Sequence, residues 1–273
     1  MTRRDPVELT PSRYFACLYS PEPAKGVLEA LCSLETEINS SLRPGLDHQV
    51  AHSRLQWWRD ECERTIEGRP AHPVTRQLLA VARHGASFAE LAGFVDVATW
   101  DLANATFATR RELGAYCERW ARAMLTPLAD TSSRQSVMAL GVSLHELELL
   151  DRFAEDARRG RLRLPLDELA CRDIDPLSAA TPTEWPDSLA SLLSERRRTL
   201  RALLAKSAAA LEIGEQTQLR GLLVWCALAW RRSQHDPRRG AERGRLESLR
   251  DAWSAWRAAR GAQSGRFQLG SSE

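Results

Sequence analysis

The stretch Glu155-Asp-Ala-Arg-Arg-Gly-Arg-Leu-Arg-Leu-Pro165 places two adjacent carboxylates directly before a dense group of arginines. Carboxylates are ligands that Mg²⁺ prefers, and arginines bind phosphate oxygens through paired N–H groups. The stretch therefore predicts one wall of a diphosphate site. Its candidate phosphate-binding side chains are Arg158, Arg159 and Arg161, together with Arg152 one turn before Asp156.

The composition is that of a globular chain, with 273 residues of which 43% are hydrophobic and 27% are charged. These values suit one large domain or two small ones. A net charge of +2 is too small to indicate a nucleic-acid partner. We expect one helical domain over residues 1–260, followed by a flexible tail over residues 261–273.

The cysteines and the apolar runs indicate the compartment. The six cysteines are scattered, without a CxxC pair or zinc-ligand spacing, which is typical of buried free thiols in a reducing cytosol. The N-terminus leads into no apolar stretch that would indicate a secretory signal. The longest apolar run, Leu222 to Trp230, is far below the roughly 20 residues that span a bilayer and predicts a buried helix. We expect a cytoplasmic protein, with contact at the inner face of the membrane as the alternative.

The hydrophobic spacing is helical almost throughout, which predicts an all-α fold. Amphipathic helices are expected over 47–67, 74–83 and 246–259. Trp58 belongs to the apolar stripe of the first helix and is expected in the core. A loop rich in proline, serine and threonine is expected from Pro176 to Pro186.

Three segments match the capping box, in which a serine or threonine and a glutamate three residues later satisfy the first N–H groups of a helix. The segments Ser87–Glu90 and Thr109–Glu112 predict helix starts at residues 87 and 109. The segment Ser143–Glu146 matches the same pattern less securely.

Four segments in order resemble the squalene/phytoene synthase family. Ser12-Arg-Tyr-Phe-Ala resembles its opening helix, and Arg54-Leu-Gln-Trp-Trp-Arg-Asp-Glu61 with His72-Pro-Val74 resembles its "RLxWWRxE…HPV" block. Asp101-Leu102 with Thr109, Glu112-Leu113 and Tyr116-Cys117 resembles "DL…T…EL…YC". The stretch from Glu155 to Pro165 resembles "EDxRRGRxYLP", the most specific of the four.

This resemblance implies an isoprenoid synthase-type helical bundle with a central cavity. In active members, two aspartate-rich motifs on facing helices hold Mg²⁺ ions, which bind an allylic prenyl diphosphate and draw off its diphosphate. The metal ligands that the resemblance offers here are Asp156, Glu155, Asp101, Glu35 and Glu37. The residues that it places on the cavity wall are Trp57, His145 and Glu148.

Both aspartate-rich motifs depart from the family pattern. The first, "FCRxxDDxxD", aligns with Leu34 to Arg43, so its aspartates fall on Asn39, Ser40 and Arg43. The second, "NxxRDxxED", aligns with Glu148 to Asp156 and has Arg152 in place of one aspartate. Asp151 cannot replace that aspartate, because one residue along a helix turns a side chain by about 100°. The tyrosine of "YLP" is replaced by Arg163. The missing aspartates argue against Mg²⁺ as a cofactor.

Simpler interpretations accompany these assignments. Arg152 and Asp156 have the spacing of an ordinary surface ion pair on a helix, and the acidic residues Glu148, Asp151 and Glu155 suit a solvated face. A lone histidine such as His145 is more often structural than functional. The arginines 196–198 and 201 are expected on a solvated helix face, with a partner or an anionic membrane as the alternative.

Three hypotheses follow. The first is a family member that binds a prenyl diphosphate or polyprenyl lipid without the Mg²⁺-dependent condensation. It resembles the non-catalytic branch of the family, which includes an assembly factor for respiratory complex I. The second is a divergent but active prenyltransferase that joins two prenyl diphosphates head to head. The third is a structural partner of a membrane respiratory complex with no lipid site.

Overall fold

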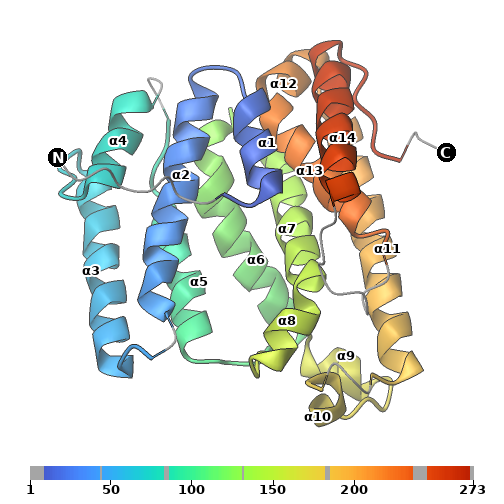
Figure 1. Ribbon diagram of the computed structural model, residues 1–273. Coiled ribbons are helices and arrows are strands. Elements are labelled where there is room, and N and C mark those ends of the chain that lie inside the picture. Colours follow the sequence, from blue (N-terminus) through green and yellow to red (C-terminus); the bar gives the residue numbers. More distant parts are fainter. Residues whose placement is uncertain are drawn as a thin grey trace.

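The computed structural model describes residues 9–43, 45–82, 86–130, 132–181, 185–235 and 245–270. All regular elements in these ranges are helices, which confirms the expected all-α fold (Figure 1). The α-helices are α1 Pro11–Tyr19, α2 Ala24–Asn39, α3 His48–Ile66, α4 Pro73–Val81, α5 Ala92–Leu102, α6 Arg110–Leu125, α7 Arg134–Asp151, α8 Phe153–Arg158, α9 Leu166–Ala170, α10 Pro176–Ala179, α11 Asp187–Ala209, α12 Ile213–Gln218, α13 Arg220–Arg232 and α14 Arg245–Gln263. The short 3₁₀ helices are η1 Ser40–Leu42 and η2 Thr126–Leu128.

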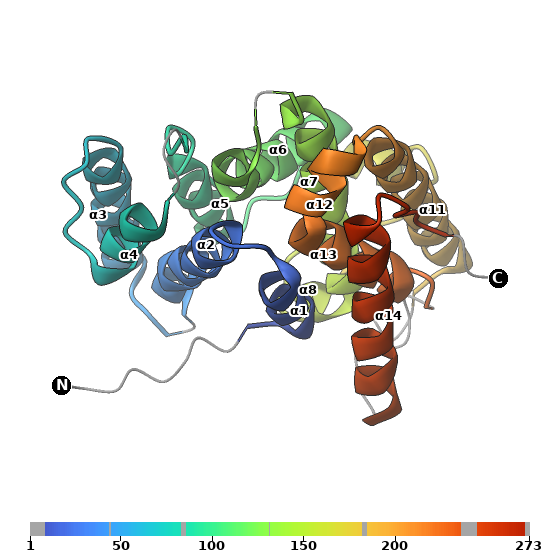
Figure 2. The same ribbon diagram turned by 90° about the horizontal axis from the view of Figure 1, so that it is seen from above.

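The helices form an elongated bundle whose middle is the packed pair α6 and α7 (Figures 1 and 2). Helices α3 and α4 lie at one end, and α11 and α14 lie at the other. Helix α1 packs against α13, and α2 packs against α4 and α5. The middle of the bundle is therefore surrounded by helices from both ends of the chain. Within the described residues, no helix is both long enough and apolar enough to cross a membrane.

Several predicted helix boundaries are confirmed. Helix α3 begins at His48, because the side chain of Asp47 accepts hydrogen bonds from the first N–H groups of the helix. Thr109 caps α6 by accepting from the N–H of Glu112 at 3.3 Å. Helix α13 contains the apolar run of the sequence and is buried along most of its length. These boundaries depend on contacts between residues close in sequence, so a local pattern was sufficient to predict them.

Two predicted helix starts are wrong. Helix α5 begins at Ala92 rather than at residue 87, because residues 89–91 form a turn. Ser143 and Glu146 lie in the interior of α7, where both are buried. The capping-box pattern at Ser143 is coincidental, since no helix end exists there for it to cap. The expected loop after Pro176 begins instead with the short helix α10.

The predicted flexible tail is wrong for residues 261–270. Helix α14 continues to Gln263, and the chain beyond it turns back onto the bundle, where Phe267 is 5% exposed. The N–H of Phe267 donates to Oε1 of Gln216 at 3.1 Å. The pattern of small and polar residues suggested fraying, but the aromatic ring at position 267 anchors this segment. Residues 271–273 lie outside the described part of the chain.

Candidate functional site

One arginine joins two carboxylates from different helices in the middle of the bundle. The guanidinium of Arg13, on α1, forms a double hydrogen bond with the carboxylate of Glu35, on α2. Its Nη2 also lies 3.9 Å from Oε2 of Glu148, on α7. The two carboxylates accept indole N–H groups as well, Glu35 from Trp120 and Glu148 from Trp225, each at 2.8 Å. The opposite helices α2 and α7 are thus connected through a shared cation.

Stacked rings lie beside this arginine. The ring of His145 lies flat against Trp120, with centroids 4.2 Å apart and planes 7° from parallel. Its other neighbour is Tyr116, whose ring centroid is 5.7 Å away. Neither ring nitrogen of His145 has a hydrogen-bond partner among the described residues, and its Nδ1 is 3.8 Å from Glu148. The stack therefore contains a buried polar group with unused hydrogen-bonding capacity.

A second arginine joins another pair of carboxylates at the far side of the stack. Nη1 of Arg163 donates to Oδ1 of Asp101 at 2.7 Å, and its Nε lies 3.6 Å from Oδ2 of Asp156. The hydroxyl of Tyr116 donates to the same oxygen of Asp101 at 3.1 Å. The guanidinium also lies over the ring of Tyr116, 5.7 Å from its centroid. Asp101 and Asp156 therefore share one buried cation, as Glu35 and Glu148 do.

The charges in this site are mutually stabilised. Burial alone would raise the pKa of Glu148, but His145, Arg13 and Arg152 lower that pKa to about 2. Burial lowers the pKa of His145 and keeps its ring neutral near pH 7. Burial opposes the charge of Arg13, yet Glu35 and Glu148 raise its pKa well above the usual value. We name the set of Arg13, Glu35, Asp101, Tyr116, Trp120, His145, Glu148, Asp156, Arg163 and Trp225 the central network.

The structure brings five of the predicted site residues into the central network: Glu35, Asp101, His145, Glu148 and Asp156. Glu155 lies elsewhere, because it forms an exposed ion pair with Arg159 at 2.8 Å. Glu37 is half-buried two residues beyond Glu35, on another face of α2. The expected pair of Arg152 and Asp156 is absent among the ion pairs of the described residues, since Asp156 faces Arg163 instead.

The predicted phosphate-binding arginines lie near the surface. Arg152 is exposed at the junction of α7 and α8, and Arg158 is exposed at the end of α8. Nε of Arg161 donates to Oδ1 of Asn104 at 3.2 Å. Arg152 lies close enough to the central network to affect the pKa values of both His145 and Glu148. Arg152 is therefore electrostatically coupled to the central network.

The placement of Trp57 on the cavity wall is wrong. Its side chain is 42% exposed, and its ring packs edge-on against its neighbour Trp58 and against His72. The guanidinium of Arg64 lies over the same ring. The physical reason is the helical repeat, because the buried face of α3 contains Trp58 and position 57 points about 100° away from it.

Arg13 was missed as a site residue, and Arg163 was grouped with the anion-binding arginines rather than paired with carboxylates. A signal existed for Arg163, since it replaces the tyrosine of the family signature, but the sequence does not show that it pairs with Asp101, 62 residues earlier. Arg13 lies in a quoted family segment, but no local pattern connects it to Glu35. The missed residues are those whose role depends on contacts between distant parts of the chain.

The donor set does not fit the Mg²⁺ cluster that the resemblance implies. Such a cluster needs several carboxylates with free oxygens that converge on a common point. Here Glu35, Glu148, Asp101 and Asp156 face buried guanidinium groups. Across the described ranges, no group of three or more His, Cys, Asp or Glu side chains is arranged to hold a metal ion.

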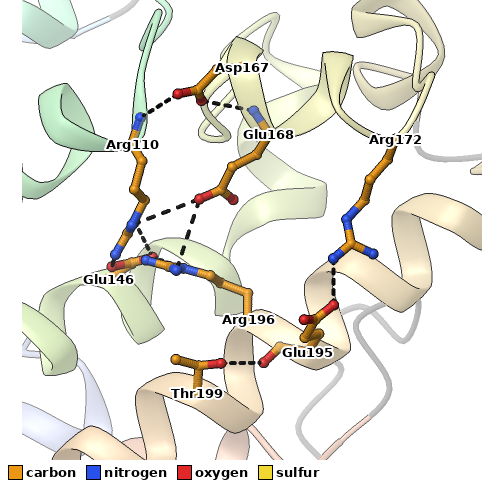
Figure 3. A network of polar contacts seen from close by, with 8 residues as sticks. All are labelled: Arg110, Glu146, Asp167, Glu168, Arg172, Glu195, Arg196 and Thr199. Carbon is orange, nitrogen blue, oxygen red and sulfur yellow. Dashed lines mark hydrogen bonds and ion pairs between the residues drawn. The ribbon is translucent and has the colours of Figure 1, made fainter.

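A second ionic network lies on the other side of α7 (Figure 3). The buried carboxylate of Glu146 accepts from both terminal nitrogens of Arg110 and from Nε of Arg196, the latter at 2.6 Å. Glu168 lies within 3.9 Å of both arginines. Arg196 was predicted to be solvated, and that prediction is wrong because the helix turns this side chain toward α7. The network joins α6, α7, α9 and α11 and has a structural role.

The cysteines agree in part with their predicted state. All six are free, and five are buried, whereas Cys171 is exposed.

Known proteins resemble this chain in both sequence and structure. The chain is 26% identical over 208 residues to a phytoene synthase of Arthrospira platensis, which covers 68% of this chain and 62% of that protein. It is 27% identical over 141 residues to a 15-cis-phytoene synthase of Synechococcus elongatus, covering 45% of this chain and 46% of that protein. The matched regions thus span less than two thirds of these relatives.

Among solved structures, a dehydrosqualene synthase in complex with a ligand superposes with a TM-score of 0.74, at 16% identity and 92% coverage of both chains. A squalene synthase from Alicyclobacillus acidocaldarius gives a TM-score of 0.64, at 15% identity, with 81% of this chain and 85% of that chain covered. At these identities, the two structures show the fold alone. The family profile described as squalene/phytoene synthase matches residues 9–256. This protein therefore belongs to the squalene/phytoene synthase family.

Proposed function

We propose that this protein binds the diphosphate end of a prenyl diphosphate, or a related polyprenyl lipid, without performing the Mg²⁺-dependent condensation. The observation behind this proposal is the pair of buried arginines in the central network. Arg13 lies between Glu35 and Glu148, and Arg163 lies between Asp101 and Asp156. Each arginine neutralises carboxylates that a metal cluster would require.

The energetic argument is that these arginines are difficult to displace. The side chains of Arg13 and Arg163 are 15% and 6% exposed, so their ion pairs are poorly screened by water. Removing one partner of a buried ion pair leaves an uncompensated charge, which costs about 3–5 kcal/mol. A Mg²⁺ ion would have to displace such a cation and also lose its own hydration. The carboxylates of the central network are thus better suited to holding arginines than to holding metal.

Lipid binding is supported by the polar groups that have no fixed partner. Neither ring nitrogen of His145 has a hydrogen-bond partner among the described residues, although Nδ1 lies 3.8 Å from Glu148. The exposed Arg152 is close enough to affect the pKa of His145. A guanidinium binds phosphate oxygens in a bidentate way, without a metal. Family membership favours a prenyl diphosphate as the ligand, with Arg152 at its anionic end and the aromatic stack beside its chain.

The first experiment measures binding and catalysis together. Farnesyl and geranylgeranyl diphosphate are added to the purified protein with Mg²⁺ or with EDTA. We expect no release of pyrophosphate, but a rise in melting temperature that is equal in both conditions. At a ligand concentration of 100 times Kd, the stabilisation is about 2.7 kcal/mol. Arg152→Gln is expected to reduce the rise, whereas Arg134→Gln, an exposed arginine at the start of α7, is the matched control.

Two outcomes would contradict the proposal. Pyrophosphate release by the wild type, abolished in Asp156→Ala, would show an active enzyme. An unchanged melting temperature with every prenyl diphosphate would exclude binding and favour a protein partner with no lipid site.

A divergent prenyltransferase is the second candidate, and membership of the family favours it. Asp101 and Asp156 come from different helices and converge on Arg163. Arg163→Tyr restores the residue of the family signature and frees both carboxylates. If Arg163 replaces the metal, the variant gains a Mg²⁺-dependent rise in melting temperature that the wild type lacks. If the wild type already responds to Mg²⁺, the second candidate is preferred.

A further inference from the structure

A groove rich in arginine lies on the far side of the molecule from α3, between α13, α14 and the C-terminal segment 266–270. Its volume is about 720 Å³. Its walls contain four arginines, Arg201, Arg231, Arg257 and Arg266, and no Asp or Glu among the described lining residues. This groove exists because the chain after α14 turns back onto the bundle.

The arginines of the groove differ in their partners. Arg231 is ion-paired with the buried Asp251 of α14. Arg201 donates instead to the carbonyl oxygen of Ser233 at 2.8 Å and lies over the ring of Trp230. Burial, and then the nearby Arg198, lower the pKa of Arg201. Arg266 is exposed at the edge. The groove therefore offers positive charge to an anionic ligand.

Helix α14 exposes large apolar side chains next to this groove. Leu249 is 68% exposed and Trp253 is 59% exposed, and Trp256 stacks on Trp253 with centroids 5.0 Å apart. At about 100° per residue, positions 249, 253 and 256 fall within a stripe about 60° wide. Arg250 and Arg257 lie on the helix surface along one edge of this stripe. We name Leu249, Trp253 and Trp256 the apolar stripe of α14.

The apolar stripe and the groove are continuous. A smaller hollow of about 360 Å³ is lined by Leu249, Arg250, Trp253, Arg231 and Ser254. It shares Arg231 and Ser254 with the groove. The residues of α14 that are exposed between Ser248 and Gln263 include three arginines and no carboxylate. Helix α14 lies at the edge of the bundle (Figure 2).

We propose that this surface binds an anionic membrane, with a lipid headgroup phosphate in the groove and the apolar stripe of α14 in the interfacial layer. Tryptophan favours the boundary between headgroups and acyl chains, and arginines beside it attract anionic lipids. A soluble phosphate ester would use the arginines but would leave the apolar stripe in water. The apolar stripe therefore selects the membrane as the source of the phosphate. This surface is separate from the central network, so the proposal is independent of the function proposed above.

The test is sedimentation of the full-length protein with vesicles. We expect binding to mixed phosphatidylcholine–phosphatidylglycerol vesicles, weakened by salt, and none to pure phosphatidylcholine. Each arginine near an anionic surface contributes about fivefold to partitioning, so Arg257→Gln with Arg266→Gln lowers the partition coefficient about 25-fold. Trp253→Ser with Trp256→Ser lowers it at every salt concentration, because the lost contact is not electrostatic. The matched control, Arg111→Gln with Arg134→Gln, removes two exposed arginines of α6 and α7 and retains binding.

Further measurements separate this proposal from its alternatives. Circular dichroism and melting temperatures verify that each variant is folded. Retained vesicle binding by Arg152→Gln supports a site distinct from the central network. Equal losses in the groove variant and in the control would overturn the proposal, because they would indicate a general charge effect. Binding of glycerol phosphate in calorimetry without binding to vesicles would overturn it in favour of a soluble ligand.

Discussion

Single residues determine the charge balance at the centre of this protein. Arg13 and Arg163 each hold two carboxylates that come from other parts of the chain. The aspartate positions of the first family motif are occupied by Asn39, Ser40 and Arg43, which lie at the end of α2 and just beyond it. The first family motif thus lacks its carboxylates here, and the acids of the central network face buried arginines.

Glu148 provides a prediction about pH. Its pKa is about 4.5 as a reference value and about 2 in the fold. A depressed pKa means that the ionised carboxylate stabilises the fold above pH 4.5, and that this contribution is lost as pH falls toward 2. We expect Glu148→Gln to lower the free energy of unfolding at pH 7 by about 2–3 kcal/mol. The difference from the wild type should shrink as the pH falls.

Urea unfolding at several pH values measures this effect. Asp151→Asn, on the same helix and outside the central network, serves as the control and should show no such pH-dependent difference. A destabilisation by Glu148→Gln that is constant from pH 7 to acidic pH would contradict the electrostatic explanation and indicate a packing effect.

At the scale of elements, α11 shows how neighbouring arginines differ in role. Arg196 binds Glu146 of α7, and Arg197 is buried and donates to the backbone oxygens of Leu150 and His235, each at 2.8 Å. Only Arg198 of the three is exposed, as expected from the sequence. Helix α11 is therefore attached to α7 and to the segment just after α13 through Arg196 and Arg197, which the sequence pattern predicted to be solvent-exposed.

Arg197 and Arg198 form a matched pair for mutation. Replacing Arg197 with Gln removes two charge-assisted hydrogen bonds to buried carbonyl oxygens, each worth about 1.5–3 kcal/mol. We expect a loss of about 3 kcal/mol in the free energy of unfolding, allowing for partial replacement by water. Arg198→Gln should change it by no more than about 0.5 kcal/mol. Chemical denaturation of both variants tests this, and equal effects would refute the assigned role of Arg197.

At the scale of the whole molecule, close approaches between helices determine the spacing of the bundle. Gly93 of α5 lies so near α6 that an added Cβ would be 2.5 Å from the backbone oxygen of Arg119. Gly114 of α6 has nothing within 4 Å of the same position. At position 93 a side chain would collide with the backbone of α6, so glycine is needed for the two helices to approach closely. At position 114 there is space for a side chain.

Alanine at these two positions should have opposite effects. Gly93→Ala forces α5 and α6 apart and is expected to cost about 2 kcal/mol of stability. Gly114→Ala fills open space in a helix and should stabilise the protein by about 0.5–1 kcal/mol, because alanine loses less conformational entropy. Thermal and urea unfolding of both variants provide the comparison. Destabilisation by Gly114→Ala would show that its surroundings are tighter than the structure indicates.

The helices, their approximate bounds and the family could be read from the chain without its structure. Helical periodicity, the Asp47 and Thr109 caps and the signature from Glu155 to Pro165 are local patterns, so they are visible in short stretches of sequence. The expectation that Glu35, Asp101, Asp156, His145 and Glu148 belong to one site came from the family resemblance, not from periodicity. Only the tertiary structure shows which arginine pairs with which carboxylate. Arg13 and Glu35 are 22 residues apart, and Arg163 and Asp101 are 62 apart. Such pairs form only when distant helices pack together, so their consequence for metal binding is a property of the folded molecule.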